Sequence, residues 1–236
     1  MMRPTFPTAV SVPVLAAAGL IGAALWVAPG PDASAHEDHD RGHKTVTQTR
    51  AVDGFTQLHI EGGMDLNVVA GEDFAVTVTT RDDHQDKVET TVEDGVLTID
   101  DDRNRIAWGD RNDIDVEVRV ALPMLEALVV DGAVDADLAL PDAGDLRIEI
   151  NGAADLEAEG SCDSLIVEVN GAGDIDLEDL HCKAVDIALN GAGDASVYAS
   201  ERVKARINGV GEIDVYGKPD RVDTRDGLLG SIDVHD

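Results

Sequence analysis

The sequence predicts an all-β protein, and more specifically a single-domain β-solenoid, similar to a parallel β-helix, with coils of about 18–20 residues. Two observations support this fold class. A short phrase built on Asn-Gly recurs through the second half of the chain, as it does in stacked repeat units. The residues between the copies alternate between apolar and polar, which is typical of strands, and no stretch after residue 35 has a helical period.

The clearest copies of the phrase begin at Asn151, Asn170, Asn190 and Asn208, which lie 19, 20 and 18 residues apart. Looser copies occur at Asp131 and Glu61. Asn-Gly suits turn positions with positive φ, and a second glycine allows a further bend or a close backbone approach. We therefore expect structural turns at each copy. Their glycines are Gly152, Gly171, Gly173, Gly191, Gly193, Gly209 and Gly211.

Apolar residues stand one, three and five positions before each Asn, and five and seven positions after it. They are Leu146, Ile148, Ile150, Leu156, Ala158; Leu165, Val167, Val169, Ile175, Leu177; Val185, Ile187, Leu189, Ala195, Val197; and Val203, Ala205, Ile207, Ile213, Val215. Each unit therefore reads as two short strands joined at the glycine turn. The units could form antiparallel hairpins or stacked coils. We favour coils, because equal offsets build continuous side-chain ladders only when equivalent residues stack.

The two cysteines support coils. Cys162 and Cys182 each lie eight residues before their Asn, so coils would place them at neighbouring strand positions, about 4.8 Å apart. A disulfide accepts that separation, and we predict one between Cys162 and Cys182. The alternative is two free buried thiols.

The N-terminal segment resembles a secretory signal. Residues 1–35 combine Arg3, an apolar run from Val10 to Val27 and the small residues Ala33-Ser34-Ala35. The alternative is an uncleaved membrane anchor. Both place the rest of the chain outside the cytoplasm, in the periplasm, on the cell surface or in the extracellular space. After cleavage we expect no membrane span.

Residues 36–51 have no apolar periodicity, and we expect a disordered acidic and histidine-rich linker there. Its histidines and acids could also chelate a transition metal. The folded domain is then expected over residues 52–236. Strands alternate around Gly62-Gly63, Asp94-Gly95 predicts a hairpin, and Asp100 to Asp113 is a charged loop that carries Trp108.

The charge is strongly negative: 48 acidic and 18 basic residues give a net charge of -30. Such a chain repels phosphate backbones, which argues against nucleic acid as a partner. The acids could attract cations or a basic partner. They could also serve solvation alone.

An acidic residue follows each turn, at Asp155, Asp174, Asp194 and Glu212. Stacked carboxylates repel, so calcium could bridge this column. The calcium-binding nonapeptide pattern is close, but it requires Asp where this chain has Ile175, Ala195 and Ile213. We favour each acid capping its own turn, and we expect no metal and no cofactor.

The order of motifs is similar to that of the head GIN domain family, which is also called the auto-transporter adhesin head domain. The likeness covers roughly residues 52–234 and rests on Leu58–Leu66, Gly95–Ile99, the recurring Gly-Ala-Gly-Asp, Val215–Pro219 and Gly230–Ile232. Departures are Val134 and Ala154 in place of the second glycine. The resemblance implies an exported β-solenoid and supplies no catalytic or ligand-binding residues.

These observations predict a non-catalytic envelope or surface protein, an adhesion or binding module for an envelope, matrix or surface protein or polysaccharide. One alternative is a polysaccharide-acting enzyme that uses Asp174, Asp176 and Asp194. Tyr198 and Tyr216 each lie eight residues after an Asn, so they could stack as neighbours or cover a sheet edge. Another alternative is an envelope signalling accessory that binds a second protein.

Overall fold

The computed structural model describes residues 44–101 and 115–235, and these contain fourteen β-strands in one mixed sheet. The strands are β1 (Thr45–Arg50), β2 (Gln57–Ala70), β3 (Ala75–Arg81), β4 (Val88–Glu93), β5 (Val96–Asp101), β6 (Glu117–Leu122), β7 (Ala127–Leu140), β8 (Asp145–Ile150), β9 (Ala153–Val169), β10 (Ile175–Leu189), β11 (Ala195–Ile207), β12 (Val210–Tyr216), β13 (Arg221–Arg225) and β14 (Leu229–Val234). A short 3-10 helix, η1 (Gln85–Lys87), is the one helical element of the described ranges. The all-β prediction is confirmed.

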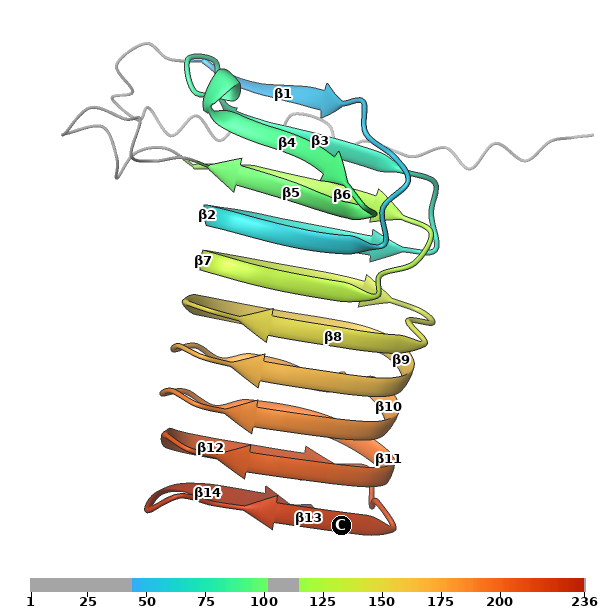
Figure 1. The fold of residues 1–236 in the computed structure, drawn as a ribbon, viewed down its shortest axis with the longest axis vertical. Helices are drawn as coiled ribbons and strands as arrows, with labels where there is room; N and C mark the ends of the chain where they lie inside the picture. Colours follow the sequence, from blue (N-terminus) through green and yellow to red (C-terminus); the bar gives the residue numbers. More distant parts are fainter. Residues whose placement is uncertain (1–43, 102–114, 236) are drawn as a thin grey trace, which may run out of the picture. The chain divides into compact units, whose positions relative to one another are not determined.

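Consecutive repeats pair in parallel, with equivalent residues side by side (Figure 1). Ile175 of β10 pairs with Leu156 of β9 and with Ala195 of β11, which hold the same place in their repeats. Each long strand contains the segment after one Asn and the segment before the next. The sheet order runs β7-β8-β9-β10-β11-β12-β14, and β13 pairs with β11. The repeats therefore do not form the antiparallel hairpins that were the alternative packing.

The apolar positions predicted from the repeat offsets are all buried. They line one continuous core with Leu58, Ile60 and Leu66 of β2 and with Leu128 and Val130 of β7. Because alternate residues of a strand point to opposite faces, the polar residues between them face outward. Parallel register then repeats this outward pattern from one strand to the next.

The first strands depart from the parallel pattern. β3 pairs antiparallel with β1 and β6, and β4 forms an antiparallel hairpin with β5. The predicted turn at Asp94-Gly95 is confirmed, with φ of 50° and 83° at these residues. The disordered linker expected over residues 36–51 is wrong for Thr45–Arg50, since β1 gains a full ladder against β3. Residues 1–43, and the loop residues 102–114 with Trp108, lie outside the described ranges.

The close backbone approach expected of the second glycines is present, since a Cβ on Gly173 would overlap the Ala154 carbonyl oxygen, but the positive φ expected of the first glycines is not found there. Positive φ occurs at the second glycines Gly173, Gly193 and Gly211, at 151°, 145° and 147°, and the first glycines are not among the positive-φ residues. A Cβ on Gly171 would instead overlap the carbonyl oxygen of Gly152 in the preceding repeat. The first glycine therefore lets the backbones of two repeats approach closely. At the looser copies, Gly62 and Gly132 lie inside the continuous strands β2 and β7.

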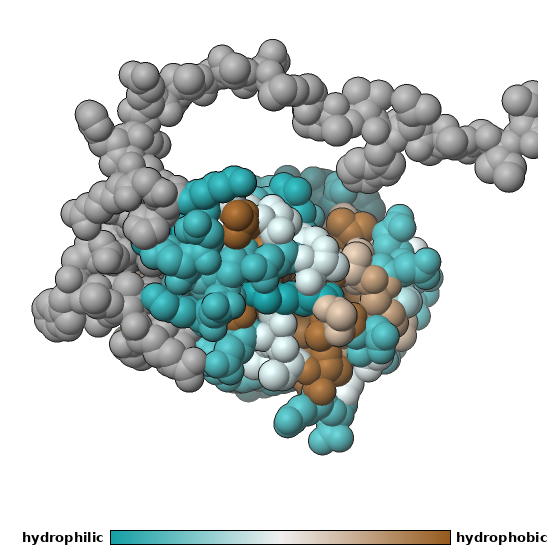
Figure 2. All heavy atoms as spheres, turned by 90° about the horizontal axis from the view of Figure 1, so that it is seen from above, coloured by the Kyte–Doolittle hydropathy of each residue, from teal (hydrophilic) through white to brown (hydrophobic). Residues whose placement is uncertain are grey.

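Figure 2 views the described residues from the end that carries β1 and β4 in Figure 1. Hydrophilic residues cover most of this end, and hydrophobic residues show as separate patches. Buried polar side chains hold it together. The Gln85 amide donates to the carbonyl oxygens of Val46 (2.7 Å) and Val78 (3.0 Å), and His84 Nε2 lies 2.7 Å from the buried Asp101 carboxylate.

Candidate functional site

The four asparagines of the repeated turn form a hydrogen-bonded ladder. Each side-chain amide donates to the side-chain oxygen of the preceding Asn, at 3.0 Å for Asn170 to Asn151, 2.9 Å for Asn190 to Asn170 and 2.8 Å for Asn208 to Asn190. Parallel register places identical amides at strand spacing, so one geometry repeats. The asparagines therefore stabilise the corner, and their amides are engaged with one another.

The ladder continues beyond the asparagines through Asp131 and His59. Asn151 donates to Asp131 (3.0 Å), and the other carboxylate oxygen of Asp131 lies 2.6 Å from His59 Nε2. These hydrogen bonds, first from His59 and then from Asn151, lower the pKa of Asp131 below its usual range. Asp131 replaces Asn in the looser copy of the phrase, and this replacement gives the ladder an anionic end.

An acidic face, as we call it here, covers the outward side of the segments that follow the turns. Its segments are 133–139, 153–159, 174–178, 194–200, 210–216 and 229–235, and none of them contains a lysine or an arginine. Its carboxylates are Asp135, Asp137, Asp155, Glu157, Glu159, Asp174, Asp176, Glu178, Asp194, Glu212, Asp214 and Asp233. All are exposed except Asp214, which is half-buried. The face is therefore a large, predominantly negative surface. It also holds His235, whose hydrogen bond with Asp214 raises the pKa of its imidazole.

The predicted column of Asp155, Asp174, Asp194 and Glu212 lies within this face. The Asp194 carboxylate accepts a hydrogen bond from the backbone N–H of Glu212 (2.9 Å), and Asp155 accepts a longer one from the N–H of Asp174 (3.5 Å). Asp155 and Asp194 thus bond to the turn of the next repeat, and the prediction that an acid caps its own turn is wrong for these two. Parallel stacking brings the next N–H within reach.

Repulsion between the carboxylates is evident at Glu212. A side-chain hydrogen bond with Asp233 raises the pKa of Glu212, and the negative charge of Asp214 raises it further. Glu212 therefore holds its proton more tightly than an isolated glutamate. Across residues 44–101 and 115–235, no group of three or more His, Cys, Asp or Glu side chains is arranged to hold a metal ion.

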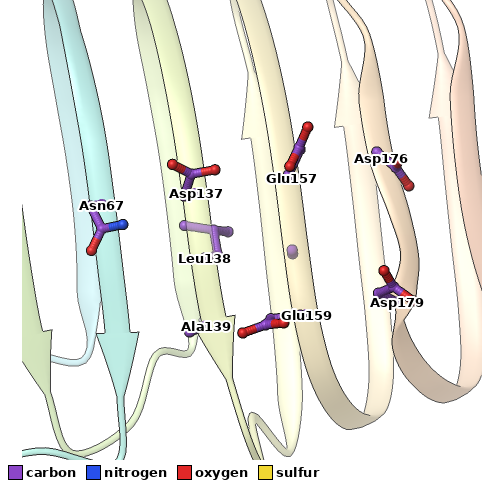
Figure 3. Close-up of a pocket in the computed structure, with 9 residues that line it drawn as sticks. Asn67, Asp137, Leu138, Ala139, Glu157, Glu159, Asp176 and Asp179 are labelled. Carbon is purple, nitrogen blue, oxygen red and sulfur yellow. The ribbon is translucent and has the colours of Figure 1, made fainter.

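A shallow hollow lies on the acidic face (Figure 3). It has a volume of about 260 Å³ and is lined by Asn67, Asp137, Leu138, Ala139, Glu157, Ala158, Glu159, Asp176 and Asp179. The carboxyl groups of Asp137, Glu157, Glu159, Asp176 and Asp179 surround it in the close-up, from β7, β9 and β10. Such a hollow suits contact with positively charged groups.

An aromatic row borders the acidic face. Tyr198 pairs in register with Tyr216, as the equal offsets from Asn predicted. The row is longer than predicted, because the ring of His181 lies 4.2 Å from that of Tyr198 and the ring of His235 stacks 4.7 Å from that of Tyr216. Burial, and then the charge of Asp214, raises the pKa of Tyr216. The spacing of seventeen residues from His181 to Tyr198 and nineteen from Tyr216 to His235 was the signal available in the sequence.

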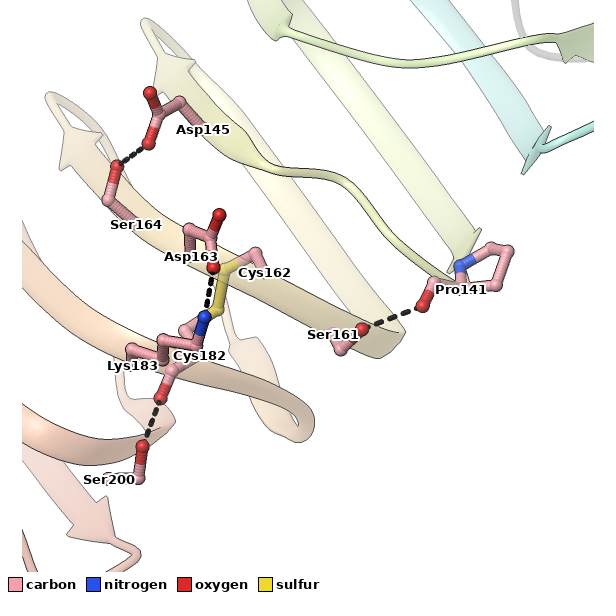
Figure 4. Close-up of a disulfide and its surroundings, with 9 residues drawn as sticks. All are labelled: Pro141, Asp145, Ser161, Cys162, Asp163, Ser164, Cys182, Lys183 and Ser200. Atoms are coloured by element: carbon pink, nitrogen blue, oxygen red, sulfur yellow. Dashed lines mark hydrogen bonds and ion pairs between the residues drawn. A yellow bond between two sulfur atoms is a disulfide. The ribbon is translucent and has the colours of Figure 1, made fainter.

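The disulfide predicted from the repeat spacing is present (Figure 4). Cys162 and Cys182 are register partners in β9 and β10, with their Cα atoms 4.5 Å apart. The ion pair of Lys183 with Asp163 joins the same two repeats beside it, and Ser200 of the next repeat donates to the Cys182 carbonyl oxygen. Both cysteines are buried, so the bond fixes the corner opposite the asparagine ladder.

Acids that were candidates for catalysis already have other hydrogen-bond roles. Ser196 donates to the Asp176 carboxylate (2.6 Å), and Asp194 accepts the Glu212 N–H. The His181 ring lies tilted against Tyr198, and His235, within the acidic face, stacks on Tyr216 and shares a hydrogen bond with Asp214. Sequence reasoning missed the buried pair of His84 and Asp101, because their separation of seventeen residues matches no motif. His84 precedes η1 and Asp101 ends β5, and both are buried, so the pair is part of the packing.

Comparison with known proteins gives the family. The chain matches the family described as putative auto-transporter adhesin, head GIN domain, over residues 54–219. No curated protein matches the chain. No helix in the described part of the chain is long and apolar enough to cross a membrane.

One solved structure shows the same fold, and two others are similar at lower TM-scores. A putative adhesin from Bacteroides fragilis aligns with a TM-score of 0.63 at 18% identity, covering 81% of this chain and 97% of that one. A putative lipid binding protein (TM-score 0.45, 18% identity, 81% and 97% covered) and a putative adhesin (0.39, 17%, 82% and 98%) both come from Parabacteroides distasonis. The family match spans more than half of the chain and confirms the resemblance read from the motifs. This chain therefore belongs to the head GIN domain family.

Proposed function

We propose that the protein is an exported, non-catalytic binding module of the cell surface or envelope, and that it binds positively charged surface material through its acidic face. The observation that carries the proposal is the absence of lysine and arginine from all six segments of that face. A surface that served solvation alone would be expected to mix both charge signs. Adhesion fits the family and the name of the Bacteroides fragilis structure.

The remaining parts of the proposal concern export and winding. Residues 1–35 act as a signal peptide, and a buried disulfide between repeats fits an oxidising compartment. The repeats wind as a β-solenoid, which the parallel one-repeat register supports. An acidic face that repeats at strand spacing can contact an extended polymer at several points. Several weak contacts then combine into a higher overall affinity.

The non-catalytic part rests on the acidic face itself. The face offers carboxylates, a serine bonded to Asp176 and two histidines in contact with tyrosine rings, of which His235 is also hydrogen-bonded to Asp214. A hydrolase would require an acid and a base whose environments separate their pKa values around one bond of the substrate. Glu212, with its raised pKa, is fully exposed and its neighbours are all acids. We therefore assign Glu212 to the column of mutually repelling carboxylates and not to catalysis.

Retention on defined surfaces tests the proposal. The purified protein is passed over immobilised poly-L-lysine, an immobilised neutral glucan and isolated envelope material, with and without calcium. We expect retention on the cationic polymer and on envelope material, with elution by salt, because the contact is electrostatic. Calcium should weaken retention by competing for the carboxylates. Retention on the glucan alone, or on none of these surfaces, would contradict the proposal.

A further inference from the structure

The two ends of the repeat stack are finished differently. At the first end, edge strand β1 presents polar residues such as Thr45, Thr47 and Gln48, and Gln85 bonds to backbone beneath it. At the other end, within the described residues, β13 pairs with β11 alone and β14 with β12 alone, so each has an open backbone edge, as β1 does at the first end. Open edges of this kind are templates for pairing with another chain.

Large apolar side chains gather at this open end. Val222 is 48% exposed, Leu228 103%, Leu229 71% and Val234 42%. Val222 occupies an inward position, because its register partner on β11 is the buried Val203. It is exposed because no described strand pairs with the other edge of β13. Apolar side chains at inward positions call for a covering layer.

The charges of β13 select one way of covering it with a second copy. Arg221 and Asp223 are outward neighbours of Val222. If two copies pair antiparallel with Val222 opposite Val222, Arg221 of each copy lies opposite Asp223 of the other. A register centred on Asp223 would instead oppose like charges, Asp223 to Asp223 and Arg221 to Arg225, which is unfavourable. The two-fold register centred on Val222 therefore pairs opposite charges and also covers the apolar side chain of Val222.

We propose that two copies of this chain associate through this end, with β13 strands paired antiparallel about Val222. The contact is two-fold symmetric, so it closes as a dimer and leaves the acidic faces of both copies accessible. Leu228 and Leu229 lie in the turn and strand next to the contact and add apolar area. This inference is independent of the proposed binding function.

A cysteine cross-link tests the register directly. In Val222→Cys the two new thiols would lie opposite each other across the two-fold axis, at a distance that a disulfide accepts. We expect mild oxidation to give a covalent dimer. Ile166→Cys is the matched control, since Ile166 is 44% exposed on β9, away from the open end, and it should stay monomeric. Equal cross-linking of both variants, or none for Val222→Cys, would overturn the proposal.

Charge reversal gives a second test that does not depend on a new cysteine. Sedimentation equilibrium is measured at about 0.15 M salt, which screens the repulsion between two acidic copies. The wild-type protein should show twice the monomer mass. Asp223→Arg should be monomeric, because each new arginine opposes Arg221 of the other copy. The double variant Arg221→Asp with Asp223→Arg should recover the dimer, since opposite charges again face each other.

Circular dichroism should show an unchanged fold for both charge variants, because both positions are exposed. A monomeric wild-type protein at every concentration would overturn the proposal, as would a double variant that behaves like Asp223→Arg. In either case Arg221 and Asp223 would only keep the edge from pairing.

Discussion

The side-chain amide of Asn190 donates a 2.9 Å hydrogen bond to the side-chain oxygen of Asn170, one repeat earlier. The same bond recurs on both sides and ends at Asp131 and His59. A phrase that looks like a ligand loop in the sequence therefore uses its polar atoms internally. The exposed carboxylates beside it are the groups left to meet a partner.

Breaking the ladder at its centre should destabilise the fold. Asn190→Ala removes the donor to Asn170 and the acceptor for Asn208, and we expect a loss of about 1–2 kcal/mol in the free energy of unfolding. Urea denaturation followed by circular dichroism measures it. Asn67→Ala, an asparagine outside the ladder, should cost less than about 0.5 kcal/mol. Equal losses for the two variants would show that the ladder adds nothing.

The first glycine of the turn should tolerate no side chain. In Gly191→Ala the new Cβ would overlap the Gly171 carbonyl oxygen, so the two repeats must move apart and their cross-strand hydrogen bonds lengthen. We expect a loss of more than about 3 kcal/mol, or failure to fold. Gly95→Ala is the control. It has a positive φ of 83° but open space around the Cβ, and it should cost only about 1 kcal/mol. The thermal unfolding temperatures of both variants distinguish these outcomes.

Reduction of the disulfide should lower stability without unfolding the sheet. The bond joins cysteines twenty residues apart, and a closed loop of this length contributes about 3 kcal/mol. Urea midpoints with and without reductant measure the contribution. The double variant Cys162→Ala with Cys182→Ala should match the reduced protein to within about 1–2 kcal/mol, the difference coming from packing. It should also show no response to reductant.

Neutralising Glu212 should stabilise the protein near neutral pH. Its folded-state pKa is raised, chiefly through Asp233 and Asp214, so its favourable contribution is complete below the ordinary glutamate pKa and is lost as pH rises through the folded value. At pH 7 its charge is therefore unfavourable, and Glu212→Gln should have the higher urea midpoint. The gap should close below about pH 4, where the wild-type residue is protonated. Glu72→Gln, on another surface, should show no gap, and a wild-type advantage at pH 7 would contradict this reading.

Much of the fold could be predicted because it follows from local periodicity. The alternation around Asn170 and Asn190 gave the buried positions, and the equal offsets of Cys162 and Cys182 gave the disulfide. The family resemblance also followed from motif order.

Other features depend on contacts that no spacing encodes. Thr45–Arg50 has the composition of a linker and becomes β1 because β3 offers it an open edge. His84 and Asp101 come together through the β4–β5 hairpin. The acidic residues were visible in the sequence, but their gathering on segments without cations required the assignment of outward positions in the structure.

The acidic face itself is tested most directly by two variants of equal net charge. One carries Asp135→Asn, Asp137→Asn, Glu157→Gln and Asp174→Asn on the acidic face. The other carries Asp53→Asn, Glu72→Gln, Asp73→Asn and Asp142→Asn, which are exposed elsewhere. Binding to immobilised poly-L-lysine is measured by surface plasmon resonance at about 0.15 M salt. We predict about tenfold weaker binding for the first variant and a change of less than about twofold for the second, because only the first removes clustered contacts. Equal weakening of both variants would show that net charge alone governs binding, and would contradict the assignment of the acidic face.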